Sequence, residues 1–321
     1  MKYKISAKYK CFVLLFEVLG IIALIPFFYQ LIPVNHSANK VFYIDSSNPN
    51  SIAKTLSQNG YDVTIIDKFA MQIVQLPTKG WYKVTSHNNR LDFFKNLYQN
   101  QTSTMQIKVY AGETAQEVIN RLAKDMKLNK NILMQEYKKR TKFIEGDILA
   151  GTYKIARKAD EKAVIKFLFD TSEKKLNTFI ANNFSHTPTY DELNTIITIA
   201  SIIQKETNKV NEMPIISSVI YNRLKRDIKL QMDATLNYKD KSHTIVTPEM
   251  IKSDNSKYNT YKYKGLPPTP IATVTLDAIY ATIHPMKSDY IFFMLQRDGT
   301  HAFAATYKEH LENINKFKSH K

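Results

Sequence analysis

The chain has 321 residues, enough for two domains or three small ones with a substantial hydrophobic core. Hydrophobic residues make up 44% and charged residues 23%, and the low numbers of glycine and proline, eight and eleven, exclude a fibrous or low-complexity chain. The net charge of +16 favours polyanionic partners, and the single cysteine, Cys11, excludes an intrachain disulfide and a structural metal site built on cysteines.

The amino end of the chain predicts a membrane anchor. Residues 11–33 form an apolar run with one charge, Glu17, and as a helix this run is about 35 Å long, which spans a bilayer. Lysines precede the run and no charge follows it until Lys40, so the positive-inside rule predicts a cytoplasmic N-terminus. We interpret residues 1–33 as a cytoplasmic tail and a single-pass anchor in the inner membrane, with the bulk of the chain in the periplasm. A cleaved signal peptide is the alternative, but the run is long for one and lacks a clear cleavage site.

This location narrows the choice of polyanion. A basic domain outside the cytoplasm does not meet nucleic acid, so lipid headgroups or an acidic wall polymer remain as partners. Glu17, an acid inside the predicted anchor, is interpreted as shallow or protonated, with a functional role as the alternative.

Two small α+β units are predicted after a linker at 34–40, the first at 41–105 and the second at 106–173. Each has an opening strand, a helix pattern, a closing strand and a second helix pattern. The closing strands share the pattern Gly-x-Tyr-Lys-(Val/Ile), which indicates a divergent tandem repeat, with coincidence as the alternative. Trp81 in the first closing strand is interpreted as a core residue, with stacking on a sugar ring as the alternative.

The C-terminal region, 174–321, contains the most informative residue, Glu206. Thr189 and Glu192 have the spacing of a capping box, which predicts the start of an apolar helix that runs to residue 207. Glu206 falls on the apolar stripe of this helix, together with Ile199, Ile202 and Ile203. Burial against such a stripe raises the pKa of a carboxyl group, which suits it to donate a proton to a leaving group. An inert glutamate at a frayed helix end is the alternative.

The rest of this region predicts further helices and a strand pair. Asn211 is expected to cap a helix that has Pro214 in its first turn. The stretch 223–240 is expected to be polar, with few apolar residues to bury. The remaining elements are a helix at 275–284, strands at 290–295 and 301–304, and a helix at 306–318. The whole exported part is therefore predicted to have an α+β fold.

Three segments are expected to form a cleft around Glu206. Two are clusters of short polar groups at 231–235 and 258–261, the layout of a cleft that recognises hydroxyl and amide groups. The third is the proline-rich segment 265–271, which is stiff and extended and suits one wall of a groove, with a rigid connector as the alternative.

Five motifs in order resemble the membrane-anchored endolytic murein transglycosylases, the MltG (YceG-like) family. They are IASIIQKET at 199–207, SVIYNRLKRDIKLQMDATLNY at 218–238, YNTYKYKGLPPTPIA at 258–272, ATIHP at 281–285 and THAF at 300–303. The resemblance implies cleavage of nascent peptidoglycan strands between MurNAc and GlcNAc, with formation of 1,6-anhydroMurNAc ends, by a C-terminal catalytic domain. It also implies that the tandem units are LysM-like, that peptidoglycan synthases are possible partners, and that Glu206 is the catalytic glutamate.

The sequence departs from the family pattern at several positions. Gln204 stands where the family often has a second acid, and helix geometry places it on the side opposite Glu206. Ala234 replaces a proline, Thr269 replaces a glycine, and the stretch between residues 238 and 258 is short. These changes bear on cleft geometry and strand-length preference.

The predicted mechanism uses Glu206 alone as general acid and then base, and it requires no metal or cofactor. Residues predicted to bind substrate are Asn222, Arg223, Gln231, Asp233, Thr235, Tyr258, Asn259, Tyr261, Pro267 and Pro268. Two alternatives stay open: a non-catalytic peptidoglycan-binding scaffold for wall synthases, and a hydrolase that uses Glu206 together with Asp233.

Overall fold

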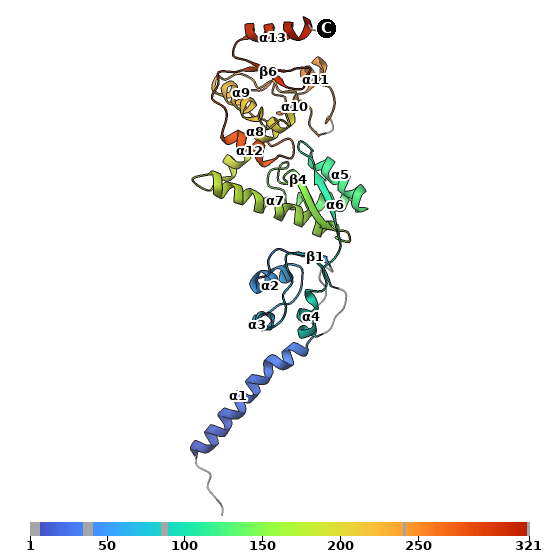
Figure 1. Cartoon of the computed structure of the whole chain (residues 1–321), viewed down its shortest axis with the longest axis vertical. Helices are drawn as coiled ribbons and strands as arrows, with labels where there is room; N and C mark the ends of the chain where they lie inside the picture. Colours follow the sequence, from blue (N-terminus) through green and yellow to red (C-terminus); the bar gives the residue numbers. More distant parts are fainter. Residues whose placement is uncertain (1–6, 35–40, 85–88, 240–241, 320–321) are drawn as a thin grey trace, which may run out of the picture. The chain divides into compact units, whose positions relative to one another are not determined.

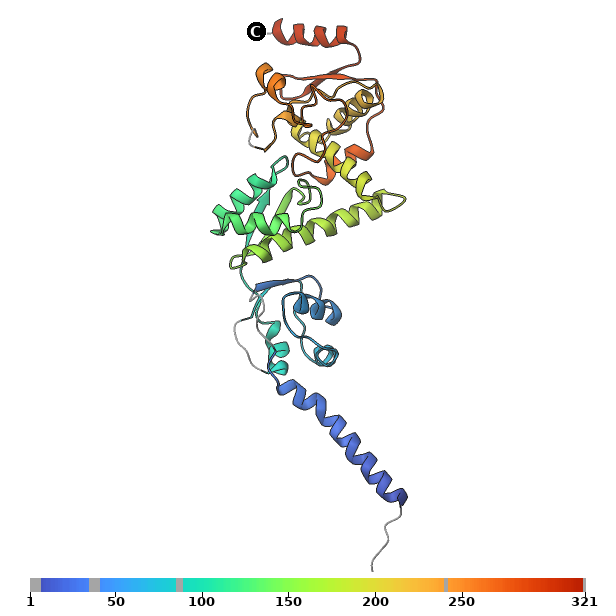
Figure 2. The same cartoon turned by 180° about the vertical axis from the view of Figure 1, so that it is seen from behind.

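The computed structural model describes residues 7–34, 41–84, 89–239 and 242–319. Most of the predicted linker and the first lysines of the predicted tail, Lys2 and Lys4, lie outside the described residues. The chain divides into two compact units, shown from two sides in Figures 1 and 2, and each is described by itself. The first unit comprises Met1–Met105 and Ile155–Ala163, and the second comprises Gln106–Lys154 and Val164–Lys321.

The predicted anchor is a helix, α1 (Ala7–Leu31). Its segment Tyr9–Leu31 is long and apolar enough to cross a membrane, and its side chains are exposed except for Tyr29 and Gln30, which the rest of the chain partly covers. The end of α1 is attached to the first unit, because the backbone N–H of Arg90 donates to the carbonyl of Ile32 at 3.0 Å.

A two-stranded antiparallel sheet and three helices make up the rest of the first unit. Strand β1 (Val41–Ile44) pairs with β2 (Gly80–Lys83), and both strands were predicted. The helices are α2 (Pro49–Gln58), α3 (Ile65–Ile73) and α4 (Arg90–Leu97). Trp81 is 2% exposed and its ring lies against that of Tyr43, so it is a core residue and the sugar-stacking alternative is wrong.

The second unit begins with a similar order of elements. Strand β3 (Thr104–Val109) is hydrogen-bonded to β4 (Gly151–Ala156). The helices are α5 (Ala115–Met126), α6 (Lys130–Lys138) and α7 (Glu161–Asn183). Helix α5 starts with a capping box, since the Glu117 carboxylate accepts from the backbone N–H of Thr114 at 2.7 Å.

The C-terminal elements are mainly helical and follow α7. They are α8 (Tyr190–Glu206), α9 (Met213–Lys225), α10 (Asp233–Leu236), α11 (Pro248–Ser253), α12 (Leu276–Ile283), β5 (Phe292–Leu295), β6 (His301–Ala304) and α13 (Tyr307–Ser319). Helix α8 is central, since α9, α10 and α12 all pack against it (Figure 1). Its capping box at Thr189 and the antiparallel β5–β6 pair confirm the sequence-based predictions.

Two local predictions were wrong. The residue that caps α9 is Glu212 rather than Asn211, and its side chain makes no capping hydrogen bond because other groups use it. The stretch 223–240 is not mainly solvent-facing, because the chain turns back onto α8 and buries apolar side chains. These are Leu230, Met232, Leu236 and Tyr238.

Backbone hydrogen bonds join the start of the second unit to the segment that follows the proline-rich run. The backbone N–H of Gly112 donates to the Thr273 carbonyl at 3.0 Å, and the N–H of Thr273 donates to the Glu113 carbonyl at 2.7 Å. The N–H of Ala150 donates to the Val274 carbonyl at 2.8 Å. Residues 106–154 and the C-terminal helices therefore share one compact unit and one α+β fold.

Candidate active site

Helix α8 presents Glu206 at its last turn. Ile199, Ile202 and Ile203 on the preceding turns are at most 1% exposed, so the helix is held by its apolar stripe. Thr207 ends the helix with an extended backbone. Glu206 is thus fixed by a buried helix on one side and meets the returning chain on the other.

The carboxyl group of Glu206 is poorly solvated. Its Oε1 atom is buried and has no hydrogen-bond partner among the described residues. Burial, and then the negative charge of Asp233, raise the pKa of Glu206 to about 7. The backbone N–H of Ala234 donates to the carboxyl group, and the cations Lys205 and Arg223 also oppose this rise. Near neutral pH the protonated and ionised forms of this carboxyl group are therefore both populated, so it can donate a proton and accept one.

The two predicted polar clusters meet beside this carboxyl group. The backbone N–H of Gln231 donates to the Thr260 carbonyl, and that of Met232 to the Thr260 hydroxyl, both at 3.1 Å. The Tyr261 hydroxyl donates to the carboxylate of Asp233. Since Asp233 starts α10 and α10 packs on α8, these bonds set the position of the charges that surround Glu206.

Arg223 supplies a fixed positive charge near the acid. Its side chain is buried, its Nε donates to the Ile291 carbonyl at 2.6 Å, and its Nη1 donates to the Leu230 carbonyl. The guanidinium lies close enough to lower the pKa of Glu206. Arg223 is therefore held by backbone carbonyls and acts on Glu206 through space.

Several other predicted substrate-binding residues make internal hydrogen bonds. The Asn222 amide donates to the carbonyls of Ser288 and Tyr290, at 2.8 and 2.9 Å. The Asn259 amide donates to backbone carbonyls of the 251–254 segment, and the Thr235 hydroxyl bonds with that of Thr260 at 2.9 Å.

The remaining candidates differ in accessibility. The Tyr258 hydroxyl bonds with that of Thr269 at 2.7 Å, which links the polar cluster to the proline-rich segment. Pro267 is buried, whereas Pro268 and Gln231 are exposed. Gln231 has a left-handed backbone, with φ of 48°. Among the candidates, Gln231, Asp233 and Pro268 are exposed, and Asn222, Tyr258 and Tyr261 are partly exposed. Asp233 and Tyr261 lie close enough to Glu206 for their charges to interact.

Gln204 has a structural role at the start of α12. Its side-chain carbonyl accepts from the Thr275 hydroxyl at 2.8 Å and from the Thr275 backbone N–H at 3.2 Å. Its amide donates to the side chain of Asn208 at 3.0 Å. A neutral amide makes both kinds of bond, whereas an ionised acid at this position accepts only.

Sequence reasoning missed a buried hydrogen-bonded contact between Glu212 and His301 that holds the residue after Glu206. The carboxylate of Glu212 accepts from the Thr207 hydroxyl at 3.0 Å and contacts His301 Nδ1 at 2.8 Å. Burial opposes the ionisation of Glu212, but the hydrogen bonds from His301 and Thr207 hold the pKa of its carboxyl group below the ordinary value. The pair attaches the C-terminal end of α8 to β6.

It also missed a second buried acid, Glu145, in the loop between α6 and β4. Its carboxyl group is 6% exposed, accepts from the Ala115 backbone N–H at 2.6 Å and contacts the Tyr238 hydroxyl at 3.5 Å. Burial raises the pKa of Glu145 to about 8, although those two hydrogen bonds oppose the rise. The signal in the sequence was an acid beside Gly146, between the apolar pairs at 143–144 and 148–149. A Cβ at Gly146 would stand 2.6 Å from the Ile197 side chain, so only glycine lets this loop approach α8.

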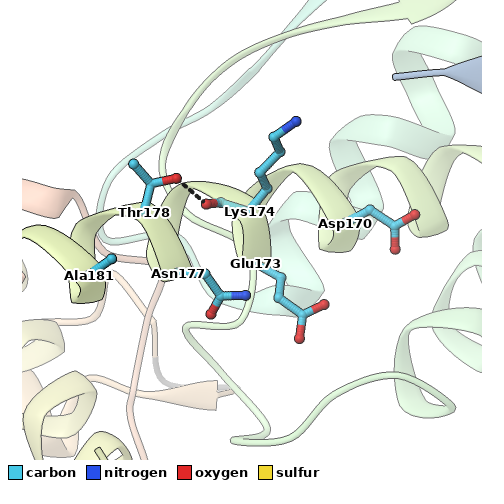
Figure 3. Close-up of a pocket in the computed structure, with 6 residues that line it drawn as sticks. All are labelled: Asp170, Glu173, Lys174, Asn177, Thr178 and Ala181. Carbon is cyan, nitrogen blue, oxygen red and sulfur yellow. Dashed lines mark hydrogen bonds between the residues drawn. The ribbon is translucent and has the colours of Figure 1, made fainter. Parts of the chain in front are cut away.

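A shallow polar groove runs along α7, away from the residues that surround Glu206. It has a volume of about 470 Å³ and is lined by Asp170, Glu173, Lys174, Asn177, Thr178 and Ala181. Figure 3 shows that all six come from successive turns of one helix, and none belongs to the environment of Glu206. Across residues 7–34, 41–84, 89–239 and 242–319 no group of three His, Cys, Asp or Glu side chains is arranged to hold a metal ion.

A family model described as the YceG-like family matches residues 42–316, which include the environment of Glu206. The chain belongs to the YceG-like family. A solved structure of a yceG-like protein from Listeria monocytogenes has a TM-score of 0.53 at 21% identity, covering 85% of this chain and 98% of that chain, which supports the fold alone.

Two relatives named endolytic murein transglycosylase match part of this YceG-like chain. The protein from Bacillus subtilis is 37% identical over 126 residues, 39% of this chain and 35% of its own length. The protein from Streptococcus pneumoniae strain D39 is 31% identical over 177 residues, 53% of this chain and 32% of its own length. The matched segments thus span about a third of the length of these relatives.

Proposed function

We propose that this YceG-like protein is a membrane-anchored endolytic murein transglycosylase with Glu206 as its general acid and base. The observation that carries the proposal is the Glu206 carboxyl group, which has a buried oxygen with no hydrogen-bond partner among the described residues and a pKa near 7. An unpartnered buried oxygen is costly to a folded protein, and a substrate oxygen that approached it would remove that cost. The names of the two relatives supply the reaction class.

In this mechanism one carboxyl group moves one proton twice. Protonated Glu206 donates to the glycosidic oxygen between MurNAc and GlcNAc as that bond breaks. The resulting carboxylate accepts the proton of the MurNAc C6 hydroxyl, whose oxygen closes on C1 and forms the 1,6-anhydro end. The Ala234 N–H, Lys205 and Arg223 stabilise the carboxylate between the two transfers, because each favours the ionised form.

Gln231, Asp233, Tyr261 and Pro268 are the proposed substrate contacts. Asn222, Arg223, Thr235, Tyr258, Asn259 and Pro267 would then support the cleft from behind. The Asp233 carboxylate, held by the Tyr261 hydroxyl, would stabilise the positive charge that develops on the sugar ring.

The remaining parts of the proposal concern location. Helix α1 would anchor the chain in the cytoplasmic membrane with its N-terminus inside and residues 41–321 outside. The segments 41–105 and 106–173 would be LysM-like modules that bind peptidoglycan, and 174–321 would be the catalytic region. Wall synthases are the expected protein partners because the substrate is nascent glycan.

Digestion of purified peptidoglycan tests the reaction. The wild-type protein should release fragments that lack one water relative to hydrolysis products, as measured by mass spectrometry. Hydrated products would favour a hydrolase with Asp233 as second carboxylate. The observation behind this alternative is that Asp233 lies close enough to Glu206 to raise its pKa. Binding to sacculi without any soluble product would favour the scaffold.

A further inference from the structure

Helix α3 presents an apolar stripe that nothing in the described part of the chain covers. Ile65, Phe69 and Ile73 are 70%, 65% and 82% exposed. Their spacing of four residues puts all three on one side of the helix. The opposite side of α3, with Asp67, Ala70 and Met71, is buried in the first unit. The exposed apolar stripe therefore runs along one side of α3, while the other side of the helix is packed in the first unit.

The start of α3 is fastened to the end of α1. The Tyr29 hydroxyl, near the C-terminal end of α1, is 2.7 Å from the Thr64 hydroxyl that precedes α3, and it donates to Asp67 at 3.4 Å. The Arg90 guanidinium donates to the same Asp67 oxygen at 2.9 Å and lies 4.6 Å from the centre of the Tyr29 ring. Figures 1 and 2 both show α3 beside this end of α1.

The inference rests on the proposed membrane anchor. If α1 spans a bilayer, these contacts fix the depth of α3 relative to the membrane surface. The segment Tyr9–Leu31 has 23 residues. At 1.5 Å per residue it is about 35 Å long, against about 30 Å of hydrocarbon, so its last turn lies at the level of the headgroups. Tyr29 belongs to that turn. A helix bonded to Tyr29 therefore starts at the membrane surface.

We infer that α3 lies on the outer surface of the membrane, with Ile65, Phe69 and Ile73 inserted at the boundary between headgroups and acyl chains. A short amphipathic helix with an apolar stripe and a basic flank has the composition of an interfacial helix. Lys68 is partly exposed and lies at the edge of the stripe, about 60° around the helix from Ile65, and its long side chain suits contact with anionic headgroups. The first unit is then held at the bilayer by a second contact beside α1.

Spin labels in the full-length protein, reconstituted in vesicles of zwitterionic and anionic phospholipid, test this arrangement. In a Cys11→Ser background, single labels are placed by Phe69→Cys and Ile73→Cys on the stripe. Lys54→Cys, an exposed position on α2, is the aqueous control, and Leu19→Cys reports on α1. The measurements are collision rates with oxygen, which concentrates in lipid, and with a water-soluble nickel chelate.

Labels at 69 and 73 are expected to collide with nickel about threefold less often than the label at 54, and more often with oxygen. Nickel collisions equal to those at 54, with Leu19→Cys still in lipid, overturn the inference and leave the anchor intact. An immobilised label shielded from both reagents also overturns it, because a protein partner then covers the stripe. If Leu19→Cys itself is aqueous, the anchor fails and the inference with it.

Discussion

Two buried carboxyl groups in the second unit, Glu206 and Glu145, differ in what satisfies them. Burial raises the pKa of both, to about 7 and about 8. Glu145 has hydrogen-bond partners on both oxygens, whereas one oxygen of Glu206 has none among the described residues. Lys205 lies near both acids, since the charges of Glu145 and Glu206 each act to raise the pKa of Lys205. A raised pKa is therefore common to both acids, and the oxygen without a partner is what sets Glu206 apart as the proposed proton donor.

The largest expected effect separates the two acids by activity. Glu206→Gln should lower the rate of anhydro-fragment release by about a thousandfold, the range of a lost general acid. Glu145→Gln should stay within about threefold of wild type, because the neutral amide reproduces the protonated acid that Ala115 and Tyr238 hold. Fragment release is followed by chromatography and mass spectrometry. Equal losses in the two variants would remove the distinction between the acids.

Stability against pH should change in both variants. Folding favours the protonated form of each acid, so its contribution is full below the ordinary pKa and is lost as the pH rises through the folded-state value, about 7 for Glu206 and about 8 for Glu145. Wild-type stability should therefore fall from about pH 5 to about pH 8, with a slope of up to about 1.4 kcal/mol per pH unit for each group. Denaturant unfolding at several pH values measures this slope.

Each glutamine variant should flatten that fall. Glu206→Gln should remove the part that ends near pH 7, and Glu145→Gln the part that ends near pH 8. An unchanged pH dependence in both would contradict the burial of the two charges.

Alanine substitutions at Gly146 and Gly265 test how closely the chain is packed at these two positions. Gly146→Ala should destabilise the protein by about 2–4 kcal/mol, because the added Cβ meets Ile197 and the backbone has a positive φ. Gly265→Ala should cost about 1 kcal/mol, because its φ is also positive but nothing lies within 4 Å of the new Cβ. Thermal unfolding measures both, and the reverse order would mean that the Glu145 loop is not closely packed on α8.

The smallest expected effect concerns Asp233. Asp233→Asn should lower the pKa of Glu206, because it removes the second-largest cause of the rise, and should move the alkaline limb of the pH–rate profile down by less than about one unit. Pro268→Ala, outside this charge cluster, serves as the control and should leave the limb in place. A limb that moves up would mean that Asp233 does not repel the charge of Glu206.

Prediction from the sequence was most accurate for features that depend on residues close together in the chain. The capping box at Thr189, the strand pair predicted at 290–295 and 301–304, and the apolar stripe that ends at Glu206 follow from local patterns alone, and all are present. Position on a stripe also foretells burial, which is the main cause of the raised pKa.

What the sequence could not predict depends on contacts between distant segments. Glu145 takes its partners from residues 115 and 238, and Glu212 is drawn away from capping by His301. The burial of Leu230 and Met232 reflects the return of the chain onto α8, which no local pattern signals. The roles of Asn222 and Asn259 depend on carbonyls that the fold brings to them.

The most direct test of the account is a titration of the Glu206 carboxyl group itself. Carbon NMR of protein labelled at glutamate side-chain carboxyls, with Glu206→Gln used to assign the resonance, follows its ionisation. The account predicts a midpoint near pH 7, and a separate midpoint near pH 8 for Glu145. A Glu206 midpoint at the ordinary glutamate value of 4.5 would contradict it, because the group would then carry no proton to donate at neutral pH.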